Sequence, residues 1–417
     1  MQKISIAFIF FLFAEALHAQ DTIQQIVAGR KNAVTQIDKP YVILISADGF
    51  RYDYADKYHA ANLLQLRQSG VKAKSMIPAF PSVTFPNHYT IATGMYPAHH
   101  GLVYNQFYDR NRKATYSMSD RKTVEDASWY GGTPLWVLAE QQGMISASYY
   151  FVGTEAAIQQ TYPTYWYKFG ENTDINYRID KVIDWLKLPE EVRPHFITFY
   201  ISNVDHDGHM YGPDAPQTEA AVKFVDKAIG SMVEKVNALG LPVNFIFLAD
   251  HGMANVDTVT RINIATMIDT ARFITRGGGS SLHLYAKNPA DILPTYEALK
   301  KKENNFTVYL RENIPAKWHY SKSDDLFDRI GDIFVVPTYP KVLSGYTNRI
   351  SRGAHGFDPA MKEMHASFYA WGPQIKKGKT IRSFENIHVY PLVCQLLGLT
   401  YSKKIDGNLK VLKKILQ

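Results

Sequence analysis

Cysteine is nearly absent from this chain of 417 residues, which contains only Cys394. A single cysteine excludes an intrachain disulfide, and with it the class of small secreted domains that disulfides hold together. Cys394 follows an apolar segment with helical spacing, so we expect it in the core. Long hydrophobic runs are scarce too. Residues 4–13 form one that is too short to cross a bilayer, and no other segment approaches spanning length.

A strong excess of charge of one sign is also missing. The formal net charge is a mild +7, and the basic runs that carry much of it lie near the C-terminus, at 376–379, 402–404 and 412–417. Such runs favour a solvated basic tail, with attraction to anionic substrates or surfaces as the weaker interpretation. We therefore expect no binding to nucleic-acid duplexes. The sequence leaves the oligomeric state open.

The N-terminus has the features of a secretory signal peptide. Lys3 precedes the apolar run, and small residues lead up to Gln20, so we expect cleavage after Ala19. The signal peptide then covers residues 1–19 and the mature domain covers 20–417. An exported chain without disulfides favours a periplasmic or secreted bacterial protein.

Three continuous apolar runs predict buried parallel strands, at 41–50, 195–205 and 243–252. Segments with helical spacing alternate with them, at 61–70, 133–143 and 218–240. This alternation predicts an α/β fold in which a doubly wound, mostly parallel sheet has helices on both faces. From about 261 to 341 the pattern changes to hairpin-like pieces and a charged helix, which we interpret as a small inserted lobe on the same domain.

Each of the three apolar runs stops at an aspartate: Asp48, Asp205 and Asp250. The carboxyl ends of parallel strands meet at one edge of a sheet, so we expect these side chains to converge there. A single Asp-Gly pair after a strand is usually a turn. Several unpaired carboxylates in one place are harder to explain, because they repel each other unless cations neutralise them.

Histidines accompany the aspartates. His209 lies four residues after Asp205, His251 directly follows Asp250, and His355 lies in the glycine-flanked loop "GAHGFDP". Mixed aspartate and histidine ligands suit zinc, and two clustered sites match the two-metal arrangement of phosphoryl-transfer enzymes. The sequence therefore favours a metal site at this edge of the sheet.

One threonine, Thr84, lies between prolines in "PSVTFPNHYTIATG", just before a segment with helical spacing. One interpretation is structural, with Ser82 or Thr84 capping a helix that starts near Pro86. The other is chemical, with Thr84 as a nucleophile held at a helix N-terminus. The segment alone favours the cap, because capping hydroxyls are far commoner than catalytic ones.

Six segments together carry a resemblance to a known family. They are "DGFRYDY", "PSVTFPNHYTIATGMYPAHHGLVYNQFYD", "WYGGTPLW", "SNVDHDGHMYGP", "LADHGM" and "GAHGFDP". In this order they resemble the nucleotide pyrophosphatase/phosphodiesterase family of the alkaline phosphatase superfamily, over residues 41–399 or so. The resemblance implies an alkaline-phosphatase-like fold and two Zn²⁺ per chain. It assigns Asp205, His209 and His355 to one zinc, and Asp48, Asp250, His251 and the Thr84 oxygen to the other.

The resemblance also implies roles for four residues. Thr84 matches the family nucleophile, which favours that role over the cap, and Asn105 matches the asparagine that binds a phosphoryl oxygen. Phe85 and Tyr149 correspond to aromatic walls that stack a nucleotide base. The aromatic segment 161–170 could be core or pocket rim, and we favour core.

The activity implied is zinc-dependent hydrolysis of nucleotide phosphodiester and pyrophosphate bonds through a phosphorylated threonine, releasing nucleoside 5′-monophosphates. Two enzymatic alternatives stay open, a choline- or lipid-type phosphodiesterase and a phosphate monoesterase of the same superfamily. A third alternative is an exported binding protein that keeps zinc for structure. Intact Thr84 and Asn105 argue against it, since closed structural zinc sites need neither.

Overall fold

A nine-stranded sheet forms the centre of the fold in the computed structural model, which describes residues 23–344 and 351–417. From one edge to the other its strands are β1 (Gln25–Ile26), β8 (Tyr165–Tyr167), β7 (Ser146–Tyr149), β9 (Phe196–Ile201), β2 (Tyr41–Ala47), β10 (Val243–Leu248), β19 (Phe368–Trp371), β3 (Val71–Ala73) and β20 (Lys379–Ile381). The strands β8, β7, β9, β2 and β10 are parallel, whereas β1 and β19 run against their neighbours.

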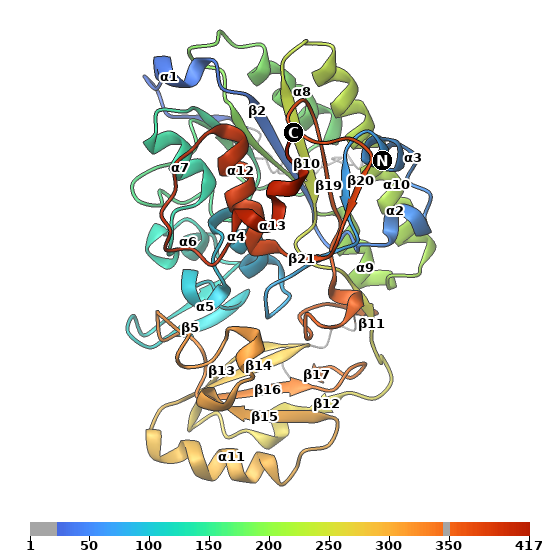
Figure 1. Cartoon of the computed structure of the whole chain (residues 1–417). Coiled ribbons are helices and arrows are strands. Elements are labelled where there is room, and N and C mark those ends of the chain that lie inside the picture. Colours follow the sequence, from blue (N-terminus) through green and yellow to red (C-terminus); the bar gives the residue numbers. More distant parts are fainter. Residues whose placement is uncertain (1–22, 345–350) are drawn as a thin grey trace, which may run out of the picture.

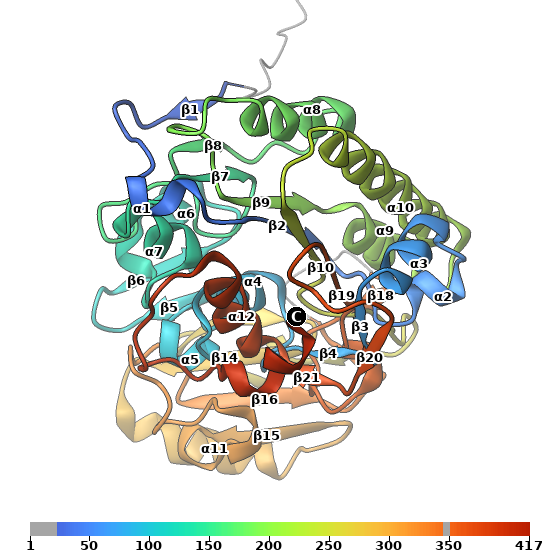
Figure 2. The ribbon, with the colours of Figure 1, turned by 45° about the horizontal axis from the view of Figure 1, so that its top comes forward.

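The central strands are apolar because both faces of the sheet are covered. Every residue of β2 and β10 is buried. Figures 1 and 2 show one group of helices on each side of the sheet. On one side α3 (Ala61–Gln68), α8 (Ile175–Leu186) and α9 (Asn203–Tyr211) pack against α10 (Pro216–Asn237). On the other, α4 (Thr84–Thr93) and α7 (Leu135–Gln141) pack against α12 (Val389–Leu397). The predicted fold class is confirmed.

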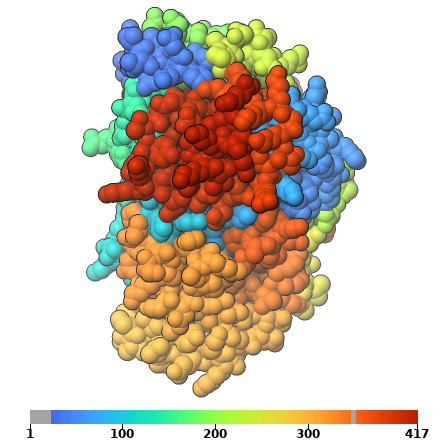
Figure 3. All heavy atoms as spheres, in the orientation of Figure 1, coloured from blue at the N-terminus to red at the C-terminus, as the bar shows by residue number. Residues whose placement is uncertain are grey.

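A smaller lobe packs against one end of this domain (Figures 1 and 3). Its antiparallel sheet has the order β13 (Phe273–Gly278), β14 (Ser281–Ala286), β16 (Ile333–Pro337) and β15 (Phe306–Leu310), and its helix is α11 (Ile292–Lys300). A separate hydrophobic cluster, which includes Leu282, Leu284 and Val335, holds it together. All four strands fall inside the range 261–341 predicted for the lobe.

The prediction of a core cysteine and the prediction of a signal peptide have different outcomes. Cys394 is fully buried in α12, which confirms its prediction as a core residue. The predicted signal peptide, residues 1–19, lies outside the described residues. Within the part of the chain that the structure describes, none of the helices is both long enough and apolar enough to cross a bilayer.

Candidate metal centre

The three predicted aspartates meet at the carboxyl ends of the central strands. Asp48 directly follows β2, and Asp250 lies two residues beyond β10, the neighbouring parallel strand. The prediction that Asp205 ends a strand is wrong. Strand β9 ends at Ile201, and Asp205 lies in the first turn of α9. A carboxylate there is favoured by the partial positive charge of a helix N-terminus.

The first ligand set combines α9 with the loop that carries His355. Asp205 and His209 lie one turn apart on α9, so both side chains project from the same face. His209 Nε2 lies 3.0 Å from His355 Nε2 and 3.5 Å from Asp205 Oδ1, and His355 Nε2 lies 3.6 Å from the same carboxylate oxygen. The three residues predicted for one zinc therefore point their donor atoms at a common place.

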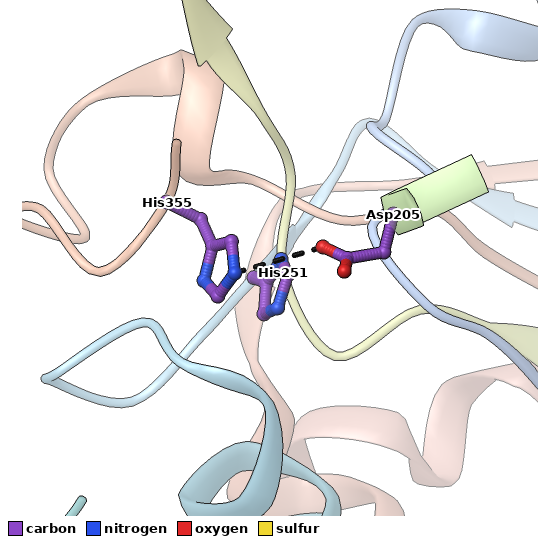
Figure 4. Close-up of side chains that lie close together, drawn as sticks. All are labelled: Asp205, His251 and His355. Carbon is purple, nitrogen blue, oxygen red and sulfur yellow. Dashed lines mark ion pairs between the residues drawn. The ribbon is translucent and has the colours of Figure 1, made fainter. Parts of the chain in front are cut away.

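The second set is centred on His251. Its Nε2 lies 3.4 Å from Asp48 Oδ1, 3.0 Å from Asp250 Oδ2 and 3.2 Å from Thr84 Oγ1. The His251 ring also stacks on the ring of His355 with a centroid distance of 3.6 Å. Figure 4 shows His251 between His355 and Asp205, so the two sets adjoin each other, as a dinuclear centre requires.

Backbone carbonyls fix the orientation of all three histidines. The Nδ1 atoms of His209, His251 and His355 lie 2.9, 2.8 and 2.9 Å from the carbonyl oxygens of Gly353, Gly252 and Ser82. A proton on Nδ1 satisfies each carbonyl and leaves the Nε2 lone pair free. Metal-binding histidines are commonly held by such a bond, because it fixes both the tautomer and the ring orientation.

The electrostatics of the centre call for cations. Asp48 Oδ1, Asp205 Oδ1 and Asp250 Oδ2 are buried, and among the residues that the structure describes none of the three has a hydrogen-bond partner. Burial, together with the charges of Asp250 and Asp205, raises the pKa of Asp48. Burial and the neighbouring His251 and His209 lower the pKa of His355, so its ring is neutral, the form that binds a metal. The donor set and its unpaired oxygens fit divalent metal ions.

Two supporting residues were not predicted from the sequence. The Tyr200 hydroxyl donates to Asp48 Oδ2 over 2.6 Å. His88 is fully buried, with Nε2 2.8 Å from Ser46 Oγ and Nδ1 3.0 Å from the Thr84 carbonyl oxygen and 3.3 Å from Asp250 Oδ2. Its position one helical turn after Thr84 is a signal that could have placed it beside the nucleophile segment.

Thr84 does not cap a helix. Helix α4 begins at Thr84, two residues before Pro86, and the capping position is held by Val83 without a side-chain hydrogen bond. The Ser82 hydroxyl donates to the carbonyl oxygen of Phe357 instead. The Thr84 hydroxyl faces His251, so the structural interpretation of this threonine is excluded for both candidate hydroxyls.

Asn105 reaches the nucleophile segment from a different part of the chain. Its Oδ1 accepts a hydrogen bond of 2.9 Å from the Phe85 backbone N–H. This bond fixes the amide plane beside the first turn of α4. It also occupies the Phe85 N–H, so the Asn105 NH₂ group is the donor left for a ligand at this point.

A comparison with protein-family models identifies the family of this chain. Residues 42–358 match the model of the type I phosphodiesterase / nucleotide pyrophosphatase family. The chain belongs to this family. The resemblance inferred from the six sequence segments is thereby confirmed.

Relatives of this phosphodiesterase-family chain differ from it in length. It is 34% identical to a venom phosphodiesterase of Crotalus durissus collilineatus over 370 residues, which are 86% of this chain and 44% of that protein. A pyrophosphatase/phosphodiesterase of Schizosaccharomyces pombe, described as uncharacterized, is 33% identical over 392 residues, 90% of this chain and 80% of the relative. The chain thus spans less than half the length of the venom enzyme.

Solved structures of the same family superpose on most of the chain. Murine ectonucleotide pyrophosphatase / phosphodiesterase 5 does so with a TM-score of 0.85 and 27% identity, covering 90% of this chain and all of the murine one. An inactive variant of that murine protein, in which a threonine is replaced by alanine, is known in complex with AMP. It has the same TM-score and identity and covers 91% of this chain.

The aromatic walls of this phosphodiesterase-family site differ from the prediction. Phe85 is half-buried beside Thr84, but Tyr149 is fully buried. Its ring stacks on Tyr167 at 4.4 Å, so it has no open face for a base and its predicted stacking role is wrong. Phe169 is 36% exposed and its ring lies 6.0 Å from Tyr200, which holds Asp48. Segment 161–170 therefore contributes both the core strand β8 and a residue near the site.

Proposed function

We propose that this protein hydrolyses nucleotide phosphodiester and pyrophosphate bonds through a phosphorylated Thr84 and releases nucleoside 5′-monophosphates. The observation that carries the proposal is the Thr84 hydroxyl, which caps nothing and lies 3.2 Å from His251 Nε2 inside a set of metal-ligand atoms. Two features of the murine relative support it: one threonine-to-alanine change is described as inactive, and the variant was captured with AMP.

Two zinc ions are part of this proposal. Asp205, His209 and His355 would hold one, and Asp48, Asp250, His251 and the Thr84 oxygen the other. Imidazole nitrogens mixed with carboxylate oxygens are a donor set that zinc accepts. Bound zinc would supply the positive charge that lowers the pKa of the Thr84 hydroxyl and offsets the charge that develops on the leaving group.

The chain's own groups bind and orient the substrate. Thr84 Oγ1 attacks phosphorus, its proton leaves, and the bond from phosphorus to the leaving group breaks as the bond to Thr84 forms. The Asn105 NH₂ group donates to a non-bridging phosphoryl oxygen, and the N-terminal end of the ten-residue helix α4 favours the same negative charge. Water then attacks phosphorus, the bond from phosphorus to Thr84 Oγ1 breaks, and a proton from that water restores the Thr84 hydroxyl as the nucleoside 5′-monophosphate is released.

A diester fits these donors better than a monoester. A dianionic monoester brings more charge, and the nucleophile region supplies Asn105, a neutral donor, where an arginine would match that charge better. The second substituent of a diester needs a surface of its own. We propose that Phe85 and Phe169 provide it by stacking on the nucleotide base, which is worth roughly 1–3 kcal/mol in comparable contacts.

The activity is tested with chromogenic substrates. We expect the purified protein to cleave a nitrophenyl ester of a nucleoside 5′-monophosphate with a far higher kcat/KM than nitrophenyl phosphate or nitrophenyl phosphocholine. Faster cleavage of the monoester would assign the protein to the phosphatases of the superfamily. Preference for the choline ester would overturn the nucleotide assignment alone, and no cleavage of any ester would favour a binding protein.

The base-stacking proposal predicts a selective effect on KM. Phe169→Ala should raise KM for the nucleotide diester by about fivefold or more, because about 1 kcal/mol of stacking is lost, and leave bis-nitrophenyl phosphate nearly unchanged. The control is Tyr149→Phe, which removes a buried hydroxyl without a partner and keeps the ring, so KM for both substrates should stay at the wild-type value. Equal losses on both substrates for Phe169→Ala would show a structural role.

We also propose that the protein acts outside the cytoplasm. The names of its relatives describe venom and ecto-enzymes, which supports the export predicted from residues 1–19. The predicted cleavage after Ala19 is checked by N-terminal sequencing of the protein recovered from the periplasm or medium of an expressing bacterium. An N-terminus at Met1 would contradict it.

A further inference from the structure

Asn105, which we propose to bind the phosphoryl oxygen, adjoins a β-hairpin that packs against the lobe. Asn105 directly precedes β5 (Gln106–Asp109), which pairs with β6 (Ala114–Ser117). Figure 1 shows β5 lying next to β13 at the junction of domain and lobe, and these two strands are in contact. The backbone of Asn105 is also bonded within the hairpin, since its carbonyl accepts a 2.9 Å hydrogen bond from the Met118 N–H.

Two tyrosine hydroxyls tie the residues just before β5 to the lobe. Tyr320 belongs to the lobe segment and is fully buried, and its hydroxyl donates to the Val103 carbonyl oxygen over 2.6 Å. Tyr104 reaches the opposite way, and its hydroxyl donates to the carbonyl oxygen of Gly278 over 3.2 Å. The Tyr104 hydroxyl also lies 3.5 Å from Ser280 Oγ, so both residues immediately before Asn105 are hydrogen-bonded to the lobe.

The carbonyl group that accepts the second of these bonds lies in the glycine-rich end of β13. Gly277 has a φ of +98°, and a Cβ there would lie 2.7 Å from the Ser281 carbonyl oxygen and 3.4 Å from the Tyr104 ring. A side chain at this position would strain the backbone and collide with the Ser281 carbonyl oxygen, whereas its distance from the Tyr104 ring is that of an ordinary van der Waals contact. The carbonyl oxygen of the next residue, Gly278, is the one that accepts the hydrogen bond from Tyr104.

The far end of the hairpin is anchored to the lobe by arginines. Arg329 is 2% exposed, and its Nε donates to Asp109 Oδ2, at the end of β5, over 2.8 Å. Arg276 on β13 donates to the Thr115 hydroxyl of β6 over 2.8 Å. A buried, hydrogen-bonded ion pair leaves an uncompensated charge if one partner moves, so it fixes the relative position of the two elements.

We propose that the lobe is a positioning element of the active site, in which Tyr104 and Tyr320 hold residues 103–105 so that the Asn105 amide lies at the first turn of α4. The proposal rests on the proposed function, because it gives Asn105 a task that needs positioning. Asn105 meets the nucleophile helix through one 2.9 Å bond to the Phe85 N–H. A shift of the hairpin relative to α4 would move the donor away from the phosphoryl oxygen.

Removal of the two hydroxyls tests this inference. Tyr104→Phe and Tyr320→Phe keep the rings and their packing, so the fold should persist. We expect kcat for the nucleotide diester to fall about three- to tenfold in each, with KM and metal content near wild type, because a misplacement of about 1 Å can cost up to about a hundredfold in rate. Wild-type kcat in both variants overturns the proposal.

A double-mutant cycle separates positioning from a general loss of stability. Asn105→Ala should lower kcat by about a hundredfold, as the loss of an oxyanion donor does. In that background Tyr104→Phe should have no further effect, since the group that it positions is gone. If the kcat loss of the double variant equals the product of the two single losses, the lobe proposal is overturned and the proposed function is not. A wild-type kcat for Asn105→Ala overturns the proposed role of Asn105, and the lobe proposal with it.

The matched control is Tyr165→Phe on β8. Tyr165 is 8% exposed, and its hydroxyl donates to the Val192 carbonyl oxygen over 3.0 Å, the same kind of bond at a place remote from hairpin and lobe. Its loss should lower the melting temperature by an amount similar to Tyr104→Phe and leave kcat unchanged. If all three variants lose kcat in proportion to stability, the positioning role is wrong.

Discussion

Thr84→Ala is expected to lose at least about a thousandfold in kcat, because removal of a nucleophile leaves only substrate binding and the oxyanion donors to act. The variant should remain folded. The Thr84 hydroxyl contacts His251 and caps no helix, so its loss costs at most about 1 kcal/mol of stability, the usual worth of one hydrogen bond. The measurement is steady-state turnover of the nucleotide diester, with metal content and melting temperature determined on the same sample.

Two companion variants make the result specific. Thr84→Ser keeps the hydroxyl and should retain part of the rate. Thr93→Ala removes a buried hydroxyl at the other end of α4, which donates to the Tyr89 carbonyl oxygen over 2.7 Å, and should retain the wild-type rate. More than a few per cent of the rate in Thr84→Ala with normal metal content would show that another group attacks phosphorus.

The sequence predicted the central strands and the site at their ends because the apolar pattern of each strand agrees with its burial in the middle of the sheet. Apart from Ser46 and Asn244, the residues in β2 and β10 are apolar without alternation, the pattern of a strand covered on both faces. The aspartates after them then fall at one sheet edge. The prediction put Asp205 in the right site and in the wrong element: the apolar run was extended through the polar segment "SNVD", whose backbone already turns into α9.

Tyr149 shows where motif resemblance fails. The resemblance assigned Tyr149 to a pocket wall, but its burial depends on residues that the local sequence does not contain. Tyr167 on the adjacent strand stacks on one side, and Trp185 of α8 and Phe199 of β9 lie within about 6 Å of the ring. A partner set assembled from three distant elements is set by tertiary packing, which propensity and spacing cannot supply.

The lobe contacts were beyond sequence reasoning for the same reason. Tyr320 and Val103 are 217 residues apart, and Arg329 and Asp109 are 220 apart. Nothing near either tyrosine marks its hydroxyl as bonded to a backbone carbonyl, because carbonyls are present at every residue. The pattern change after residue 260 predicted that a lobe exists, and only the structure links it to Asn105.

Removal of metal is expected to abolish activity completely and to destabilise the fold. The purified protein should carry two zinc ions per chain by elemental analysis. Without them, the buried oxygens of Asp48, Asp205 and Asp250 lack hydrogen-bond partners within residues 23–344 and 351–417, and the carboxylates repel each other. Exhaustive chelation should therefore lower the melting temperature, and zinc added back should restore both stability and turnover, because a ligand that binds only the folded state stabilises it.

Two histidine variants, one at a proposed ligand and one as its control, distinguish the two metal sites of this centre. His355→Ala removes a donor from the set with Asp205 and His209 and leaves Asp48, Asp250 and His251 in place, so zinc content should fall from two ions to one. His365→Ala is the matched control, because both of its ring nitrogens already meet protein oxygens, Ser75 Oγ at 2.7 Å and the Pro359 carbonyl at 3.0 Å. It should keep two ions. A single ion in the wild-type protein, or full activity after chelation, would refute the dinuclear centre, whereas loss of both ions from His355→Ala would show that the two sites fill only together.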